Sequence, residues 1–346
     1  MTSKETSILI IYTGGTIGMI ANPETGAYKP FDFNYLPENI PALQKFGFRL
    51  ETVAFDQPID SANLKPDTWV KLANILLENY SKYDGFVILH GTDTMAYTSS
   101  ALSFILQNFN KPIILTGSQL PVETLRTDGK ENLITSIEIA AAKTADGKAI
   151  VPEVCVYFDN QLFRGNRTTK KNAEYFDAFD SPNFPRLAKA GINIKYNRQI
   201  IRYPQDENVP IIQTKLDTHV ALIKLFPGIS EEFFDAVFSI KNLKGVVLET
   251  FGSGNAFMDD WFIKKLSRAN DDGIVLVNIT QCHGGKVSMG KYETSRLLQN
   301  AGVASGHDMT TEAAITKLMY LAGLGLNRDE ITNFINKSLA GEISTN

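Results

Sequence analysis

Short runs of Val, Ile, Leu and Phe alternate with helical segments through the first half of the chain. The apolar runs are continuous, which is typical of strands buried on both faces of a sheet; they cover Ile8–Tyr12, Gly85–His90, Pro112–Thr116 and Glu153–Phe158. Between them, apolar residues at helical spacing predict helices at Pro66–Tyr80, Thr94–Gln107 and Glu131–Lys143. This alternation predicts a mostly parallel sheet with helices on both faces.

The pattern weakens between about Tyr196 and Asp217, where Tyr203-Pro204 and Pro210 interrupt any helix. A second alternation follows, with strands expected at His219–Phe226, Gly245–Thr250 and Ile274–Thr280. Helices are expected at Glu231–Ile240, Asp259–Asn270, Thr311–Leu321 and Arg328–Leu339. The sequence therefore predicts an α/β protein of two domains: a larger N-terminal domain at 1–195 with a mostly parallel sheet and flanking helices, a linker at 196–218, and a smaller C-terminal parallel α/β domain at 219–346.

The composition of the 346-residue chain is that of an average globular protein, with 43% hydrophobic and 21% charged residues. This mix excludes the disordered and fibrous classes. The net charge of −4 argues against binding nucleic acid or an anionic membrane through a general basic surface. No apolar run reaches the roughly 18 to 20 residues of a membrane helix, and Ile8–Tyr12 is too short for a signal-peptide core. We expect a cytoplasmic protein with neither nucleic-acid nor membrane partners.

The two cysteines, Cys155 and Cys282, are too few and too far apart in the sequence for a disulfide scaffold or a zinc finger. The four histidines are scattered without the spacing of a helical metal site. We therefore expect no metal and no cofactor, while noting that a magnesium site made only of carboxylates leaves no firm mark in a sequence.

Polar residues gather directly after three of the predicted strands. The segments are Thr13–Gly18, His90–Thr94 and Thr116–Gln119. In open α/β sheets ligands bind at the carboxyl ends of the strands, so these hydroxyls, carboxylate and glycines are expected at one rim. The glycines of the first segment spell neither a dinucleotide nor a P-loop fingerprint, which argues against a nucleotide-dependent oxidoreductase.

Each polar segment also has an interpretation without chemistry. Thr16 could hydrogen-bond its own turn, and one residue of Thr92-Asp93-Thr94 could merely cap a helix. Asp93 could instead receive a substrate ammonium group. The basic stretch Arg164–Lys171 could be a solvated loop, or one of its lysines could fold back to the rim and act on a threonine hydroxyl.

Several motifs together resemble the signatures of the bacterial L-asparaginases, most closely the cytoplasmic type I branch. The motifs are Thr13–Gly18, His90–Met95 and Arg164–Lys170, supported by Tyr83–His90, Leu115–Gln119, Gly252–Ala256 and Thr280–Cys282. They occur in order over nearly the whole chain. The resemblance implies hydrolysis of L-asparagine to L-aspartate and ammonia through a threonine-linked acyl-enzyme, with the N-terminal domain as the catalytic one.

The resemblance also implies roles for individual residues. Thr16 matches the nucleophile, Tyr28 an assisting tyrosine, and Thr92, Asp93 and Lys170 the activating triad. The residues that match the substrate-binding positions are Asp60, Ser61, Thr92, Asp93, Ser118, Gln119 and Asn255. Ser61 would contact the α-carboxylate and Asp93 the α-ammonium. Asn255 would reach the site across an intimate dimer interface, within a homotetramer made of two such dimers.

The residue types suit this chemistry. An amide is a poor electrophile, so a hydroxyl nucleophile needs a base and a donor for the developing oxyanion. Lys170 is the available base, but a carboxylate at Asp93 would favour its protonated form, whereas burial would favour the neutral amine. Proton transfer could therefore run directly to Lys170, or through Thr92 with the lysine as an electrostatic aid.

Type I enzymes can bind a second asparagine as an activator in a pocket between subunits, and Thr169 and Cys282 match positions of that pocket. The arginine expected before Gly252 is replaced by Glu249, which would repel an α-carboxylate, so we expect weak or absent cooperativity. Glutaminase activity is the nearest alternative, because one methylene is worth only about 1–3 kcal/mol of discrimination. A non-catalytic amino-acid sensor is a remote one, since such a protein could lack Thr16 or Lys170.

Overall fold

The computed structural model describes residues 5–21, 28–30, 40–203 and 209–344. The continuous apolar runs of the N-terminal half form neighbouring buried strands. The chain divides into two units, the first made of Met1–Ser181 and Pro185–Gln213 and the second of Pro182–Phe184 and Thr214–Asn346.

The first unit is built on an eight-stranded sheet with the order β13-β12-β9-β8-β7-β5-β1-β4. The strands are β1 (Ser7–Tyr12), β4 (Arg49–Ala54), β5 (Gly85–Leu89), β7 (Ile113–Thr116), β8 (Val154–Phe158), β9 (Gln161–Arg164), β12 (Ala188–Lys189) and β13 (Lys195–Tyr196). The five strands from β4 to β8 are parallel, and β9, β12 and β13 continue the sheet in antiparallel pairs. Every residue of β1, β5, β7 and β8 is buried, as continuous apolar runs predict.

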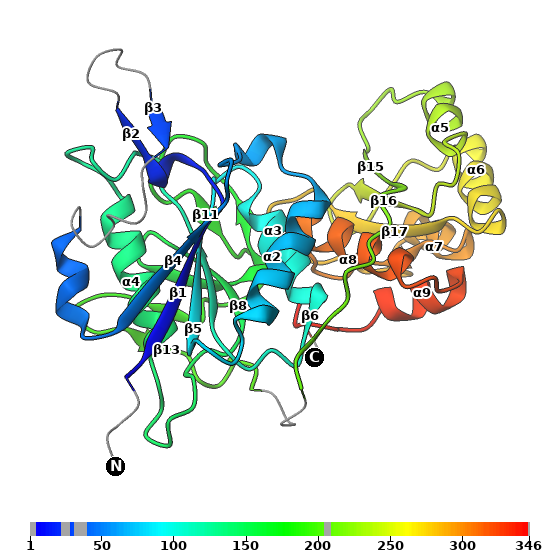
Figure 1. The fold of residues 1–346 in the computed structure, drawn as a ribbon. Coiled ribbons are helices and arrows are strands. Elements are labelled where there is room, and N and C mark those ends of the chain that lie inside the picture. Colours follow the sequence, from blue (N-terminus) through cyan, green and yellow to red (C-terminus); the bar gives the residue numbers. More distant parts are fainter. Residues whose placement is uncertain (1–4, 22–27, 31–39, 204–208, 345–346) are drawn as a thin grey trace. The chain divides into compact units, whose positions relative to one another are not determined.

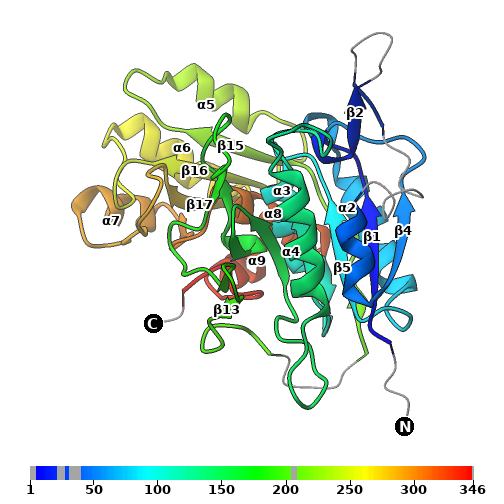
Figure 2. The same ribbon diagram turned by 90° about the vertical axis from the view of Figure 1, so that its left-hand side faces the viewer.

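Helices cover both faces of this sheet, as Figures 1 and 2 show for α2 (Pro66–Glu78) and α3 (Met95–Ile105) on one side and α4 (Gly129–Ala141) on the other. Helix α2 begins at Pro66, carries Asp67 in its first turn, and buries Trp69 and Leu72. Proline at the start and an acidic first turn both favour a helix N-terminus. The predicted fold class is confirmed for this part of the chain.

Short elements connect the principal ones in the first unit. They are the 3-10 helices η1 (Thr16–Gly18), η3 (Pro41–Phe46), η4 (Ser61–Asn63) and η5 (Gly165–Arg167), and the paired short strands β2 (Met19–Ala21) with β3 (Tyr28–Pro30), β10 (Thr169–Lys170) with β11 (Phe179–Asp180), and β6 (Leu106–Gln107) with β14 (Ile211–Ile212).

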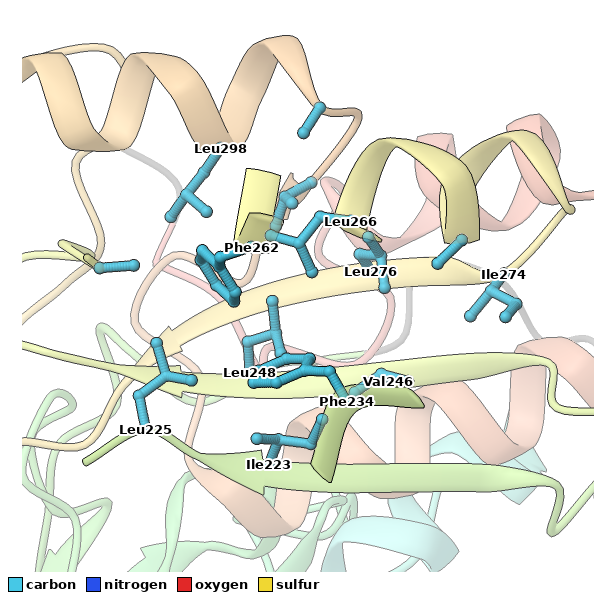
Figure 3. Close-up of a cluster of buried hydrophobic side chains, with 14 of the residues drawn as sticks. Ile223, Leu225, Phe234, Val246, Leu248, Phe262, Leu266, Ile274, Leu276 and Leu298 are labelled. Carbon is cyan, nitrogen blue, oxygen red and sulfur yellow. The ribbon is translucent and has the colours of Figure 1, made fainter. Parts of the chain in front are cut away.

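The second unit has its own four-stranded parallel sheet, ordered β15-β16-β17-β18. Its elements are β15 (Val220–Lys224), α5 (Glu231–Phe238), β16 (Gly245–Thr250), α6 (Asp260–Asp271), β17 (Val275–Thr280), α7 (Glu293–Asn300), β18 (Ala304–Ser305), α8 (Thr311–Gly323) and α9 (Arg328–Ile335). Phe234 of α5, Phe262 of α6 and Leu298 of α7 pack on one face of the sheet in a cluster with Leu248 and Leu276 (Figure 3). The smaller parallel α/β unit is thus also as predicted. Within the described residues, the helices are too short or too polar to span a bilayer.

Candidate active site

Three polar loops meet at one edge of the larger sheet. Strands β1, β5 and β7 are parallel neighbours, so their carboxyl ends lie at the same edge. The loops that leave them are Thr13–Gly18, His90–Thr94 and Thr116–Gln119. The prediction of a common rim is confirmed, and it places hydroxyl, amide and carboxylate groups where ligands bind in open α/β sheets.

Two glycines allow the first two loops to touch through their backbones. Gly15 has φ +88°, and a Cβ added to it would lie 2.5 Å from the backbone nitrogen of Gly91. Only glycine adopts this conformation at this separation without displacing its neighbour. Thr16 and Thr92 directly follow the two glycines, so both threonines lie on adjoining loops of the rim.

Thr16 begins η1 and is half-buried. Among the described residues, none forms a hydrogen bond with its hydroxyl, so the structure gives no support to the interpretation that it stabilises its own turn. Tyr28 belongs by its backbone to β3, where it pairs with Ala21. Its side chain lies outside what the structure describes.

Lys170 connects the β10–β11 hairpin, to which it belongs, with the loop His90–Thr94. Its Nζ donates to Thr92 Oγ1 at 2.8 Å and to Asp93 Oδ1 at 2.7 Å. The lysine side chain is only 18% exposed, whereas that of Asp93 is 61% exposed. The Lys170 nitrogen therefore contacts both of the residues that the resemblance groups with it as a triad, through one hydroxyl and one carboxylate oxygen.

The interpretation of the basic stretch as a solvated loop is wrong. Arg164, Arg167 and Thr168 are buried, and Arg164 forms a bidentate ion pair with Glu153 at 2.6 and 3.1 Å. Such a pair keeps two buried charges satisfied and fixes the start of the segment. The segment ends with Lys170 at the rim.

The capping interpretation of Thr92-Asp93-Thr94 is also wrong. Thr94 occupies the N-cap position of α3, but its side chain makes no capping hydrogen bond. Its hydroxyl instead donates to the backbone oxygen of Ser61 at 2.8 Å. This bond ties the loop before α3 to the segment that contains Asp60 and Ser61.

Ser61 is buried against the same loop, since a Cβ added to Gly91 would lie 2.5 Å from its Oγ. Asp60 is exposed and caps η4 by accepting from the backbone N–H of Ala62. Ser118 is buried and donates to the carbonyl of Leu120 at 2.6 Å. Its hydroxyl hydrogen is thus engaged within its own turn.

His90 supports the site in a way that the sequence analysis did not identify. The ring is fully buried, with Nδ1 2.7 Å from the carbonyl of Gly91 and Nε2 2.9 Å from the Thr98 hydroxyl. The Trp69 indole N–H donates to that hydroxyl at 3.1 Å. Burial lowers the pKa of His90 to about 4, so the neutral ring holds the backbone just before Thr92.

The remaining candidate residues are Thr169 in the first unit and three residues of the second unit. Thr169 belongs to β10 and pairs with Asp180. Asn255, Glu249 and Cys282 belong to the second unit: Asn255 accepts from the Thr294 hydroxyl at 2.8 Å, and Cys282 is an exposed free thiol. The intersubunit roles of these residues stay predictions.

Comparisons with known proteins agree with the motifs over the whole chain. The family model described as Asparaginase, N-terminal matches residues 7–202, and that described as Glutaminase/Asparaginase C-terminal domain matches residues 219–335. The chain is 41% identical over 346 residues to L-asparaginase 1 of Escherichia coli (strain K12), with 99% of each chain covered. The crystal structure of L-asparaginase I from Vibrio cholerae matches with a TM-score of 0.88 at 38% identity, over 99% of this chain and 100% of that one. The thermostable L-asparaginase from Thermococcus kodakarensis matches with a TM-score of 0.89 at 31% identity, over the same shares.

Proposed function

This chain belongs to the asparaginase family, and we propose that it hydrolyses L-asparagine to L-aspartate and ammonia. The observation that carries the proposal is the contact of Lys170 with Thr92 and Asp93, on a loop that adjoins the one bearing Thr16. A hydroxyl, an amine and a carboxylate at one rim are the groups that a hydroxyl nucleophile needs in order to act on an amide.

In the proposed reaction, Thr16 is the nucleophile. Its oxygen forms a bond to the side-chain amide carbon, the carbon–nitrogen bond breaks, and the threonine proton ends on the departing ammonia. Water then cleaves the aspartyl ester, giving its hydroxyl to the product and returning a proton to Thr16. Tyr28 assists these proton movements, as the resemblance implies.

Lys170 acts in this proposal as an electrostatic aid rather than as a neutral base. Its nitrogen donates simultaneously to Thr92 and to the Asp93 carboxylate, at 2.8 and 2.7 Å. Both contacts use N–H groups of the lysine, so it serves as a hydrogen-bond donor to the carboxylate and to the hydroxyl. These contacts hold the Thr92 hydroxyl beside the loop that bears Thr16, where its oxygen can accept a hydrogen bond from the nucleophile or from water.

Substrate recognition follows from charge. Asp93, whose carboxylate is largely exposed at the rim, would bind the α-ammonium group, and Ser61 would bind the α-carboxylate. The resemblance also assigns substrate contacts to Asp60, Ser118, Gln119 and, from a neighbouring subunit, Asn255. Of these, Gln119 has its side-chain amide engaged by Thr92 and the β10–β11 turn instead. We also propose a cytoplasmic homotetramer made of intimate dimers, for which the support is the family resemblance. Light scattering coupled to size-exclusion chromatography measures the molar mass and so tests the number of subunits.

Glutamine is the second candidate substrate, because the matching C-terminal family is described as glutaminase and asparaginase together. The same chemistry acts on a side chain one methylene longer, a difference of about 1–3 kcal/mol. Ammonia release measured side by side from both amino acids ranks them.

The test of the mechanism is the replacement Thr16→Ala, with Thr16→Ser as the matched control that keeps a hydroxyl. We expect Thr16→Ala to lower kcat by roughly three orders of magnitude or more, and Thr16→Ser to retain far more activity. Mass spectrometry of the wild type quenched during turnover should find an aspartyl ester on the peptide containing Thr16. An alanine variant with unchanged turnover removes Thr16 as the nucleophile.

A further inference from the structure

Gln119 lies between the loop His90–Thr94, called here the catalytic loop, and the β10–β11 hairpin that carries Lys170. Its Oε1 accepts from the Thr92 hydroxyl at 3.3 Å. Its Nε2 donates to the carbonyls of Ala173 and Tyr175, both at 3.2 Å. These two carbonyls belong to the turn between β10 and β11, three and five residues after Lys170.

The contacts leave one orientation for the Gln119 amide. Two carbonyl oxygens can only accept, so the NH₂ group must face Ala173 and Tyr175. The amide oxygen is thereby directed to Thr92. The backbone is fixed as well, because the Asp128 carboxylate accepts from the Gln119 N–H at 3.0 and 3.1 Å.

This orientation determines the direction of the Thr92 hydroxyl. Lys170 donates to Thr92 Oγ1, so one lone pair of that oxygen is occupied. The single hydroxyl hydrogen points to Gln119 Oε1. The second lone pair remains, and it can only accept, which suits a donor such as the Thr16 hydroxyl or an attacking water.

We infer that Gln119 is a positioning residue that acts through Thr92: its amide clamps the β10–β11 turn to the catalytic loop and holds the Thr92 hydroxyl as an acceptor toward the reacting groups. The inference rests on the proposed function for its kinetic consequence. It differs from the substrate-contact role that the resemblance implies, because a substrate contact changes KM whereas an orienting contact changes kcat.

The first test replaces Gln119 by methionine, which keeps the length of the side chain and removes all three polar contacts. We expect kcat for asparagine to fall about tenfold or more, with KM within about twofold of the wild type. Gln299→Met, on an exposed position of α7, is the matched control and should leave both constants unchanged. Unchanged kcat in Gln119→Met, or a raised KM alone, overturns the inference.

The second test uses Gln119→Glu and measures how its kcat, relative to that of the wild type, depends on pH. A mere loss of structure would not produce such a dependence. An ionised carboxylate cannot donate to the two carbonyls, whereas a protonated carboxyl has one donor and one acceptor and can restore part of the clamp. We expect the ratio of variant to wild-type kcat to rise about threefold or more as the pH falls from 8 to 5. A ratio that is independent of pH contradicts the clamp.

A third measurement does not depend on which amide the enzyme hydrolyses. Hydrogen exchange of the peptide covering 171–178 should be faster in Gln119→Met than in the wild type and the Gln299→Met control. Equal exchange in all three proteins overturns the clamp. A wild type inactive on both amino acids would refute the proposed function alone, since hydrogen exchange still decides the clamp.

Discussion

His90 lies buried at the end of β5, where its two ring nitrogens contact the Gly91 carbonyl and the Thr98 hydroxyl. Burial lowers its pKa to about 4 from an ordinary value of 6.5. The unfolded chain therefore binds a proton between these two pH values that the folded chain does not bind. The resulting stability is present above about pH 6.5 and is lost as the pH falls toward 4.

We therefore expect the free energy of unfolding of the wild type to fall by about 3 kcal/mol between pH 7 and pH 4 through His90. In His90→Gln, whose amide can also donate and accept but does not titrate, this contribution should be absent. Urea unfolding of both proteins at several pH values measures the difference. If the free energy of unfolding falls equally with pH in the two proteins, His90 makes no contribution to the pH dependence of stability, and the expectation is wrong.

At the scale of single residues, the sequence predicts which residue types carry the chemistry better than it predicts the hydrogen-bond and ion-pair partners of each side chain. The resemblance to the asparaginases indicates Thr16, Thr92 and Lys170, whereas each of these segments taken alone also has an interpretation without chemistry. The sequence does not indicate that Gln119 faces Ala173 and Tyr175, since that contact arises only when two separate loops fold together. Nor does it distinguish a buried basic segment from a solvated one, because the acidic partner Glu153 lies eleven residues away.

Among the elements, α3 positions both halves of the proposed triad. It begins after Thr92 and Asp93, and one of its buried hydroxyls, that of Ser99, donates to the carbonyl of Gly165 at 2.9 Å. A Cβ added to Gly165 would lie 2.9 Å from the Cβ of Ser99, so η5 packs directly on the helix. The chain then runs from η5 to Lys170, and small residues at this contact set the position of the lysine.

Enlarging Ser99 should therefore affect catalysis as well as stability. We expect Ser99→Ala, which removes the hydroxyl's contacts with the carbonyls of Ala96 and Gly165, to lower the free energy of unfolding by about 1 kcal/mol with little change in kcat. Ser99→Leu should lower it by about 1–3 kcal/mol or more, and should lower kcat by tenfold or more because η5 must move and take Lys170 with it. Urea unfolding and asparagine kinetics on both variants test this. A Ser99→Leu variant that is destabilised yet fully active would show that the α3–η5 contact does not control the position of Lys170.

The elements that the sequence missed are those whose hydrophobic pattern is weak. β4 reads Arg-Leu-Glu-Thr-Val-Ala and lies half-exposed at the edge of the sheet, so it lacks a continuous apolar run. β9, β12 and β13 are two to four residues long and form through pairing rather than through their own pattern. α7 was missed because its eight residues bury only Ser295 and Leu298. The strongly periodic helices and the fully buried strands were predicted within a few residues.

For the whole molecule, two alternating α/β patterns predict two parallel sheets, and each forms in its own unit. The linker at 196–218 is predicted from the weak hydrophobic pattern, the charged pair Asp206-Glu207 and the prolines of this segment. The first unit extends to Gln213, because Ile211 and Ile212 of β14 pair with β6 of that unit. Such a pairing over a hundred residues of sequence has no local signal, so the boundaries of the domains stay a prediction that limited proteolysis can test.

The charge of Glu249 bears on whether a second asparagine could act as an activator between subunits. Its carboxylate accepts from the Thr311 hydroxyl and lies 3.7 Å from Lys224 Nζ, so contacts within the second unit hold this negative charge in place. Where the resemblance leads one to expect an arginine for the carboxylate of an activating asparagine, a fixed carboxylate repels that group.

We therefore expect the velocity of the wild type to rise hyperbolically with asparagine concentration, with a Hill coefficient near one. Initial rates over a wide range of asparagine concentrations, for the wild type and Glu249→Gln, measure this directly. Removing the charge should leave the curve hyperbolic, because neutralising Glu249 does not supply the missing cation. A sigmoidal wild-type curve that becomes hyperbolic in Glu249→Gln would contradict this expectation, since Glu249 would then support the binding of an activator instead of preventing it.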